Sequence, residues 1–328
     1  MKKILLVAFV VVSCVGVNAQ QDPQFTQNMF NRLYVNPGFA GSNGSICGTL
    51  INREQWMGFE GNPKTTVFSA DGGFKVRQKY QMGGGLSIMQ DELGPIKSLN
   101  VKLAASYHHR IQQGVLAIGL DFGIFNQSIN GEWRTSSGNF DGTEDPSIPN
   151  SEAGKTSFDL GGGLYYYTKD LYVGISSTHL NQPTISDKPD EQSAYNYEQV
   201  RHYYVMAGYN YPLSVGFGEL ELQPSIFAKT DGVSTQLDLN TNVLYNNLVW
   251  AGVSYRLEDA VSFLAGVKLE DIGMVPAELQ PLQIGLAYDF TTSELSNHSD
   301  GSMEFMLRYC YKISKALKIE RYKSVRFL

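Results

Sequence analysis

The stretch Val233-Ser-Thr-Gln-Leu-Asp-Leu-Asn-Thr-Asn-Val243 alternates between apolar or β-branched residues and polar residues. Successive residues of a strand point to opposite faces, so this period of two predicts a strand with one apolar and one polar face. The same alternation recurs in 115–128, 155–167, 260–270 and 281–289. One such strand fits a soluble sandwich as well as a membrane barrel, so the number of strands and their connections must decide.

Fourteen segments carry strand signals. They are approximately 44–54, 64–74, 80–91, 95–109, 115–128, 155–167, 170–179, 201–212, 218–230, 233–245, 248–256, 260–270, 281–289 and 302–310. An even number of strands with apolar faces outward and polar faces inward is typical of bacterial outer-membrane barrels. Aromatic clusters near segment ends, such as Tyr165–Tyr167, match the girdles at the membrane interfaces. The predicted fold is all-β, a closed antiparallel outer-membrane β-barrel of about 14 strands.

The connections support the barrel. Residues 168–170, 230–232 and 246–247 form tight turns, whereas 129–154 and 180–200 are long and polar. Short turns on one side and long loops on the other match a barrel whose turns face the periplasm. A soluble two-sheet protein fits less well, because it would have to protect the edges of its sheets.

The N-terminus has the pattern of a secretory signal peptide in residues 1–19. Lys2 and Lys3 precede the apolar run Ile4–Val12, and Val17-Asn18-Ala19 supplies a cleavage site before Gln20. An alternative places a lipoprotein cleavage at Cys14. Later residues contain no apolar run long enough for a transmembrane helix.

Two segments flank the predicted barrel, which spans 44–310. Residues 20–43 are predicted to pack at the periplasmic mouth, because a solvated tail would not need their large apolar side chains. These are Phe25, Met29, Phe30, Leu33, Tyr34 and Phe39. The C-terminal periplasmic tail, 311–328, has six Lys or Arg against one Glu, which fits either docking of an acidic partner or a solvated tail.

Composition and motifs exclude several functions. The formal net charge of −6 leaves no basic surface for nucleic acid. Serine-hydrolase, metalloprotease, Cys-x-x-Cys and phosphate-loop motifs are missing from the sequence. His108 and His109 would point to opposite faces of a strand, and no cofactor or metal is expected. A barrel hydrolase would require a base next to a serine nucleophile, and His179 with Ser176 or Ser177 is the pair that the sequence offers for that role.

Residues 24–42, QFTQNMFNRLYVNPGFAGS, and 53–65, REQWMGFEGNPKT, resemble the PorP/SprF family of Bacteroidetes outer-membrane proteins. Similar motifs continue downstream as DELGP at 91–95, HLNQP at 179–183 and GSME at 301–304. The resemblance implies a fourteen-stranded barrel of the type IX secretion system, located in the cell outer membrane. It also implies a role in secretion or surface attachment of cargo such as adhesins, and in gliding motility in gliding species.

The leading functional hypothesis is therefore a non-enzymatic component that acts by protein–protein interaction. Its partners would be a secreted cargo's C-terminal domain, periplasmic components of the machinery, or both, with outer-membrane lipid around the barrel. The alternative is a channel for small solutes. Candidate partner-binding residues are Arg53, Gln55, Trp56, Phe59, His179 and Asn181. Trp56 fits the outer aromatic girdle equally well.

Barrel closure makes a prediction about the two cysteines of the mature chain. Cys47 lies near the start of the first predicted strand and Cys310 at the end of the last. Both positions reach the periplasmic rim in an even-stranded barrel, so their Cα atoms are expected within about 10 Å. A disulfide additionally requires that register and side-chain direction agree, and sequence alone leaves this open.

Overall fold

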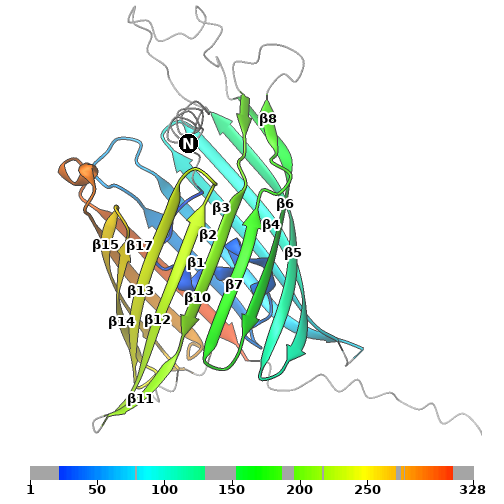
Figure 1. Cartoon of the computed structure of the whole chain (residues 1–328). Helices are drawn as coiled ribbons and strands as arrows, with labels where there is room; N and C mark the ends of the chain where they lie inside the picture. Colours follow the sequence, from blue (N-terminus) through cyan, green and yellow to red (C-terminus); the bar gives the residue numbers. More distant parts are fainter. Residues whose placement is uncertain are drawn as a thin grey trace, which may run out of the picture.

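The computed structural model describes residues 22–77, 80–129, 153–186, 196–215, 218–270, 275–276 and 278–312. These residues form one closed antiparallel barrel (Figure 1). Its strands are β1 Ile46–Glu54, β2 Lys64–Val76, β3 Tyr80–Leu93, β4 Ile96–Ile111, β5 Gly114–Ile129, β6 Ala153–Tyr167, β7 Leu171–Thr178, β10 His202–Tyr209, β11 Tyr211–Val215, β12 Gly218–Thr230, β13 Thr235–Tyr245, β14 Val249–Arg256, β15 Ala260–Lys268, β16 Leu282–Thr291 and β17 Ser302–Tyr311. A separate hairpin consists of β8 Thr184–Ser186 and β9 Asn196–Glu198.

The barrel is closed by the pairing of its first and last strands. β1 pairs along its whole length with β17. β10 pairs with β7 on one side and with β12 on the other, and β11 follows β10 and also pairs with β12. Because β10 and β11 occupy one position in the ring, the wall has fourteen strands, which confirms the predicted fold.

The polarity of the two strand faces is the reverse of that in a soluble protein, with apolar side chains pointing outward and polar side chains inward. On β13, Asp238 and Asn240 are at most 3% exposed and point inward, whereas Leu239 is 46% exposed and points outward. Outward residues such as Leu103 and Phe263 are more than half exposed. Apolar residues outside and polar residues inside are the pattern that lipid requires of a barrel wall. Within the described residues, no helix has the length and hydropathy of a membrane span.

The two ends of the barrel differ. The strands β1, β5 and β7 end at the loop end, and the turn end carries the tight connections that follow β4, β6 and β13. The sorting by length is incomplete, because strand direction alone decides the end at which a connection lies. The tight turn at 230–232, predicted with the other short turns, lies at the loop end, whereas β15 ends at Lys268 and β16 begins at Leu282, both at the turn end.

Residues 22–43 pass through the barrel, and we call this segment the plug. It contains η1 Asn28–Phe30, α2 Arg32–Val35 and η2 Pro37–Phe39. The Asn36 side chain accepts a hydrogen bond from Gly38 N (2.9 Å), which starts η2. The large apolar side chains of the plug are buried as expected, Phe30 only partly. The plug begins at the loop end and leads into β1 at the turn end, which corrects the predicted position at the periplasmic mouth. Polar anchors along the whole lumen explain this path.

Candidate functional site

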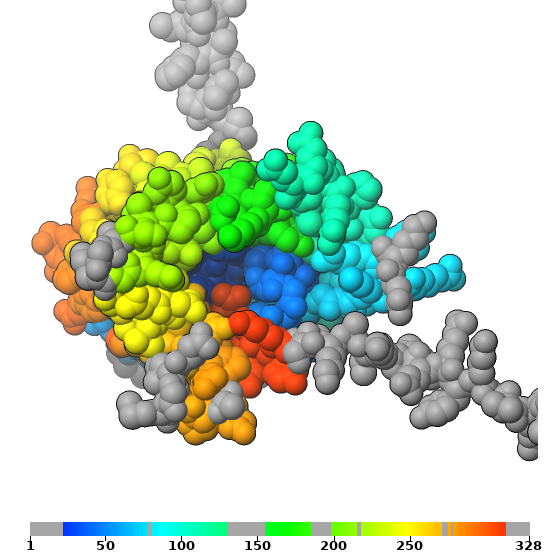
Figure 2. All heavy atoms as spheres, turned by 90° about the horizontal axis from the view of Figure 1, so that it is seen from below, coloured from blue at the N-terminus to red at the C-terminus, as the bar shows by residue number. Residues whose placement is uncertain are grey.

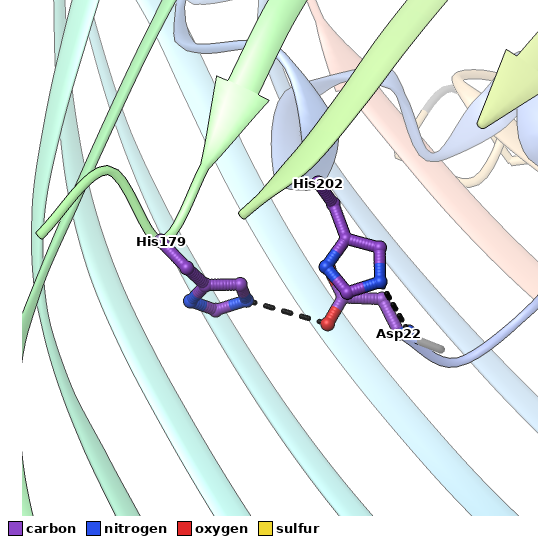
Figure 3. Close-up of side chains that lie close together, drawn as sticks. All are labelled: Asp22, His179 and His202. Atoms are coloured by element: carbon purple, nitrogen blue, oxygen red, sulfur yellow. Dashed lines mark hydrogen bonds and ion pairs between the residues drawn. The ribbon is translucent and has the colours of Figure 1, made fainter. Parts of the chain in front are cut away.

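Many buried polar and charged side chains of the described residues lie at the interface between the plug and the barrel wall. At the loop end it is built around Asp22, the first described residue. Its carboxylate faces His179 Nε2 at 3.3 Å, and it accepts hydrogen bonds from Tyr204 and Thr178. Its backbone N–H donates to His202 Nε2 at 3.2 Å. Figure 3 shows both imidazoles directed to this aspartate, His179 from the end of β7 and His202 from the start of β10.

The charges around Asp22 compensate one another. His179 Nδ1 lies 3.0 Å from the Asp159 carboxylate, and the Lys102 ammonium is 3.8 Å from the same carboxylate. The Lys229 ammonium donates to the Asp22 carbonyl at 2.7 Å. Together with the nearby buried Asp121, the cluster contains three carboxylates and, with His179 protonated, three cations. The wall thus neutralises the start of the plug.

Two groups of this cluster lie outside the strands and titrate abnormally. Burial opposes ionisation of Asp22, but electrostatic interactions with the neighbouring imidazoles of His202 and His179 outweigh it and lower the pKa of this carboxyl well below its usual value. Burial also opposes protonation of His179, yet the charge of Asp22 and the hydrogen bond to Asp159 raise its pKa to about 9. His179 is therefore an imidazolium at neutral pH and donates to both carboxylates.

The same three residues form a geometric candidate for a metal. Asp22, His179 and His202 each present one ligand atom, and these atoms lie within 4.8 Å of one another. Their ring nitrogens are already engaged, since His179 bonds to Asp159 and Asp22, and His202 bonds to Val200 O and Asp22 N. With the charges balanced by protein groups, we assign the cluster to anchoring of the plug.

Beside it, also toward the loop end, a second cluster joins the plug to the closing strands. Arg53 Nη1 lies 2.6 Å from the Glu304 carboxylate and Arg53 Nη2 lies 2.8 Å from Asp289. Glu304 also accepts the backbone N–H groups of Thr26 and Gln27. Arg256 completes the network, with ion pairs to three carboxylates of the wall, Asp238, Asp259 and Asp289. Buried charges of this kind stabilise a structure only when they are paired and hydrogen-bonded, and these are.

Glycines of the wall make room for the second half of the plug, residues 36–41. A Cβ at Gly119 on β5 would lie 2.3 Å from Gly38 N, and one at Gly163 on β6 would lie 2.2 Å from Asn36 Oδ1. Further along, Ser106 donates to the Ala40 carbonyl at 2.7 Å, and Gly41 N donates to Asp71 at 2.8 Å. The plug backbone therefore lies directly against the sheet, where only glycine leaves sufficient space.

The predicted partner-binding residues divide into two groups. Phe59 is 38% exposed, Asn181 is exposed, and Gln55 and Trp56 are half-buried, all at the loop end. Arg53 and His179 are 2% and 1% exposed and point into the lumen. Their expected exposure was wrong: Arg53 continues the inward face of β1, where Asp289 and Glu304 bind it, and two carboxylates draw His179 inward.

The hydrolase alternative also fails on geometry. His179 is directed to Asp159 and Asp22. The Ser176 hydroxyl donates to the plug carbonyl of Val35 at 2.7 Å, and the Ser177 hydroxyl is directed to Thr178 O. The described residues thus offer no serine positioned for attack with His179 as its base.

At the turn end, the cysteines occupy the seam. Cys47 and Cys310 are register partners of β1 and β17, with Cα atoms 4.1 Å apart, and their sulfur atoms form a disulfide. The pairing follows from the closure of the ring. The sequence analysis did not identify Asp22, Thr26, Asp289 and Glu304 as anchors of the plug. For Asp289 and Glu304, which lie in strands, a charged residue on the inward face of the strand was the signal that could have found them.

Several expectations from the sequence fall outside the described residues. They concern the signal peptide 1–19, the C-terminal tail beyond residue 312, and the loop residues 130–152 and 187–195.

A closed antiparallel barrel with an apolar outer face and an internal plug defines a β-barrel protein of the outer-membrane type. The family model for the type IX secretion system membrane protein PorP/SprF matches residues 17–309, and the chain belongs to this family. The resemblance seen in the sequence is thereby confirmed. The protein is a membrane component of the type IX secretion system.

The chain is also similar to solved outer-membrane barrels at low sequence identity. A mutant of the Rh. blastica porin has 9% sequence identity and a TM-score of 0.32, covering 81% of this chain and 99% of the porin. CdiB from Acinetobacter baumannii has 7% identity and a TM-score of 0.43, covering 81% of this chain and 60% of CdiB. No curated protein matches the chain significantly.

Proposed function

We propose that this protein is a non-enzymatic, non-conducting outer-membrane component of the type IX secretion system that retains secreted cargo, such as adhesins, at the cell surface. In gliding species this role would serve motility. The observation that carries the proposal is the plug. Residues 22–43 run through the lumen and are tied to the wall by the buried ion pair of Asp22 with His179 and by hydrogen bonds of Thr26, Asn36 and Gly41 further along.

The plug argues against the alternative of a solute channel. Thr26, Asn36 and Ala40 are fully buried between plug and wall. Displacing the plug would break the buried hydrogen bonds that Thr26 and Gln27 donate to the Glu304 and Asp289 carboxylates, and hydrogen bonds to charged groups contribute about 1.5–3 kcal/mol each. With the lumen occupied, the surfaces left for function are the two ends of the barrel and the lipid-facing wall.

The proposed orientation places the loop end at the cell surface and the turn end in the periplasm, as in other outer-membrane barrels. The loop end would then present Gln55, Trp56, Phe59 and Asn181 to a cargo's C-terminal domain. Tryptophan and other large aromatic side chains at a rim are favourable anchors for a protein interface. The turn end would face periplasmic components of the machinery.

Two measurements test the proposal. In a strain that lacks the protein, cargo should appear in the culture medium instead of on the cell surface, and expression of the intact chain should restore its retention. The purified protein should show no steady conductance in a planar lipid bilayer. Unchanged cargo retention would refute the attachment role, whereas a steady open conductance would support the channel.

A further inference from the structure

A hollow at the turn end lies between the plug and the wall (Figure 2). Its inner cavity has a volume of about 140 Å³. It shares Arg32, Tyr172 and Asn210 with a second cavity of about 180 Å³, and Lys268, Gln283 and Arg308 with a third of about 230 Å³. We call these three adjoining cavities the turn-end vestibule. Seen from this end, the N-terminal segment, coloured blue, lies at the bottom of the hollow.

The inner cavity has a one-sided charge. Arg32 from α2, Lys268 from the end of β15 and Arg308 from β17 line it, and its described lining contains no acidic residue. This differs from the cluster toward the loop end, where Arg53 and Arg256 are each paired with at least two carboxylates. The positive charge of the inner cavity is therefore not compensated in the same way. The second and third cavities have one acidic residue each, Asp170 and Glu270, and Glu270 is paired with Lys312.

The two arginines have unused hydrogen-bonding capacity. Their Nε atoms are buried and have no hydrogen-bond partner, and in the described part of the chain neither guanidinium has a carboxylate within 4.0 Å. Arg32 lies 3.8 Å above the Tyr172 ring and donates to Tyr165 OH. Arg308 Nη2 lies 3.9 Å from Cys47 Sγ, a weak acceptor. Asp71 acts on Arg308 electrostatically, but its carboxylate is bonded to Gly41 N.

We propose that the turn-end vestibule binds a carboxylate of an acidic partner polypeptide that enters from the turn end. A guanidinium matches a carboxylate with two parallel hydrogen bonds, and two guanidiniums with an ammonium provide the charge. The inner cavity accommodates a side-chain or terminal carboxylate, and the adjoining cavities continue the path for the residues that follow. The chain's own C-terminal tail has the wrong sign, with six Lys or Arg against one Glu in 311–328.

This inference goes beyond the proposed cargo retention, because it concerns the opposite end of the barrel and the chemistry of a second partner. The test uses the full-length protein in lipid nanodiscs and a fluorescent hexapeptide that contains three glutamates, with fluorescence anisotropy as the readout. The acidic peptide should bind, and the same peptide with glutamines should not. Raising the salt concentration should weaken binding, since it screens charges.

Matched variants locate the site. R308Q should weaken binding of the acidic peptide by about tenfold, because one charge-assisted hydrogen-bonded pair is lost. R110Q removes the same charge from an exposed position near the turn-end tip of β4, outside the vestibule, and should bind the peptide like the unmodified protein. Heat-dependent migration on gels verifies that both barrels are folded. Equal affinity of R308Q and the unmodified protein, or equal binding of the glutamine peptide, would overturn the proposal. Succinate that competes as effectively as the peptide would overturn its assignment to a polypeptide.

Discussion

Arg53 on β1 and Glu304 on β17 are register partners across the seam at which the barrel closes, and their side chains form a buried ion pair of 2.6 Å. The same Glu304 carboxylate accepts the N–H groups of Thr26 and Gln27 from the plug. One carboxylate thus joins the first strand, the last strand and the plug. Closure of the wall and seating of the plug are therefore coupled in this fold.

Replacing Arg53 by methionine should strongly destabilise the barrel. The substitution leaves Glu304 and Asp289 as buried carboxylates with one cationic partner fewer, and breaking a buried pair in this way costs about 3–5 kcal/mol. Urea unfolding in lipid vesicles, followed by tryptophan fluorescence, measures the change. The control is K64Q, which breaks the exposed pair Lys64–Glu54 and should cost less than about 1 kcal/mol. Similar unfolding midpoints for the two variants would contradict the coupling.

A methyl group at Gly119 should unseat the plug. The added Cβ would lie 2.3 Å from Gly38 N, and the sheet cannot retreat without breaking its ladder, so a cost of about 1–3 kcal/mol is expected. G119A should therefore speed hydrogen exchange in residues 22–43. Gly84 on β3 provides the matched control, because its Cβ would meet nothing closer than Phe74 Cε1 at 3.5 Å. If G84A and G119A exchange alike, the plug is not held by this close contact.

The sequence predicts the strands of the barrel wall better than the path of the plug inside it. Alternation places Asp238 and Asn240 on the inward face, and the even strand number brings Cys47 and Cys310 to one seam. The path of the plug does not follow from local patterns, because its anchors are as far apart in sequence as Thr26 and Glu304. His179 follows the end of β7, where period two no longer assigns a face. A charged side chain on the inward face of a strand can therefore be predicted from the sequence. The residue with which it pairs cannot, because that depends on which strands the closed barrel brings together.

Anchoring of the plug at the loop end should depend on pH. Because the pKa of His179 is raised to about 9, its stabilising contribution is fully present below the unfolded value near 6.5 and is lost as pH rises through about 9. The pKa of Asp22 is lowered, so its contribution is present above about 4 and is lost as pH falls further. Unfolding measured between pH 4 and 10 should show a loss on the order of 3 kcal/mol on the alkaline side. H179Q should remove most of this alkaline dependence, and an unchanged profile would exclude His179 as its source.

The disulfide across the seam should be detectable and stabilising. Peptide mass mapping without reduction should recover Cys47 and Cys310 in one linked pair, since their sulfur atoms are bonded in the closed ring. Replacing both by serine should lower the free energy of unfolding by about 2–5 kcal/mol. Free thiols at both positions in protein isolated from the outer membrane would refute the linkage.

The turn between β1 and β2 should determine cargo retention without affecting the barrel. Met57 N donates to Gly301 O at 2.8 Å and Asp300 N donates to Met57 O at 2.7 Å, so this turn is fixed against the β16–β17 connection. Phe59 remains 38% exposed and Trp56 half-buried at this rim. The double variant W56A/F59A should release cargo into the medium while heat-dependent migration on gels stays normal. The control is F290A, which removes an outward aromatic side chain near the loop-end tip of β16 that is 54% exposed. Phe290 faces lipid, so its loss should not affect a contact with cargo at the rim. If F290A releases as much cargo as W56A/F59A, then Trp56 and Phe59 act as girdle residues and not as a binding surface.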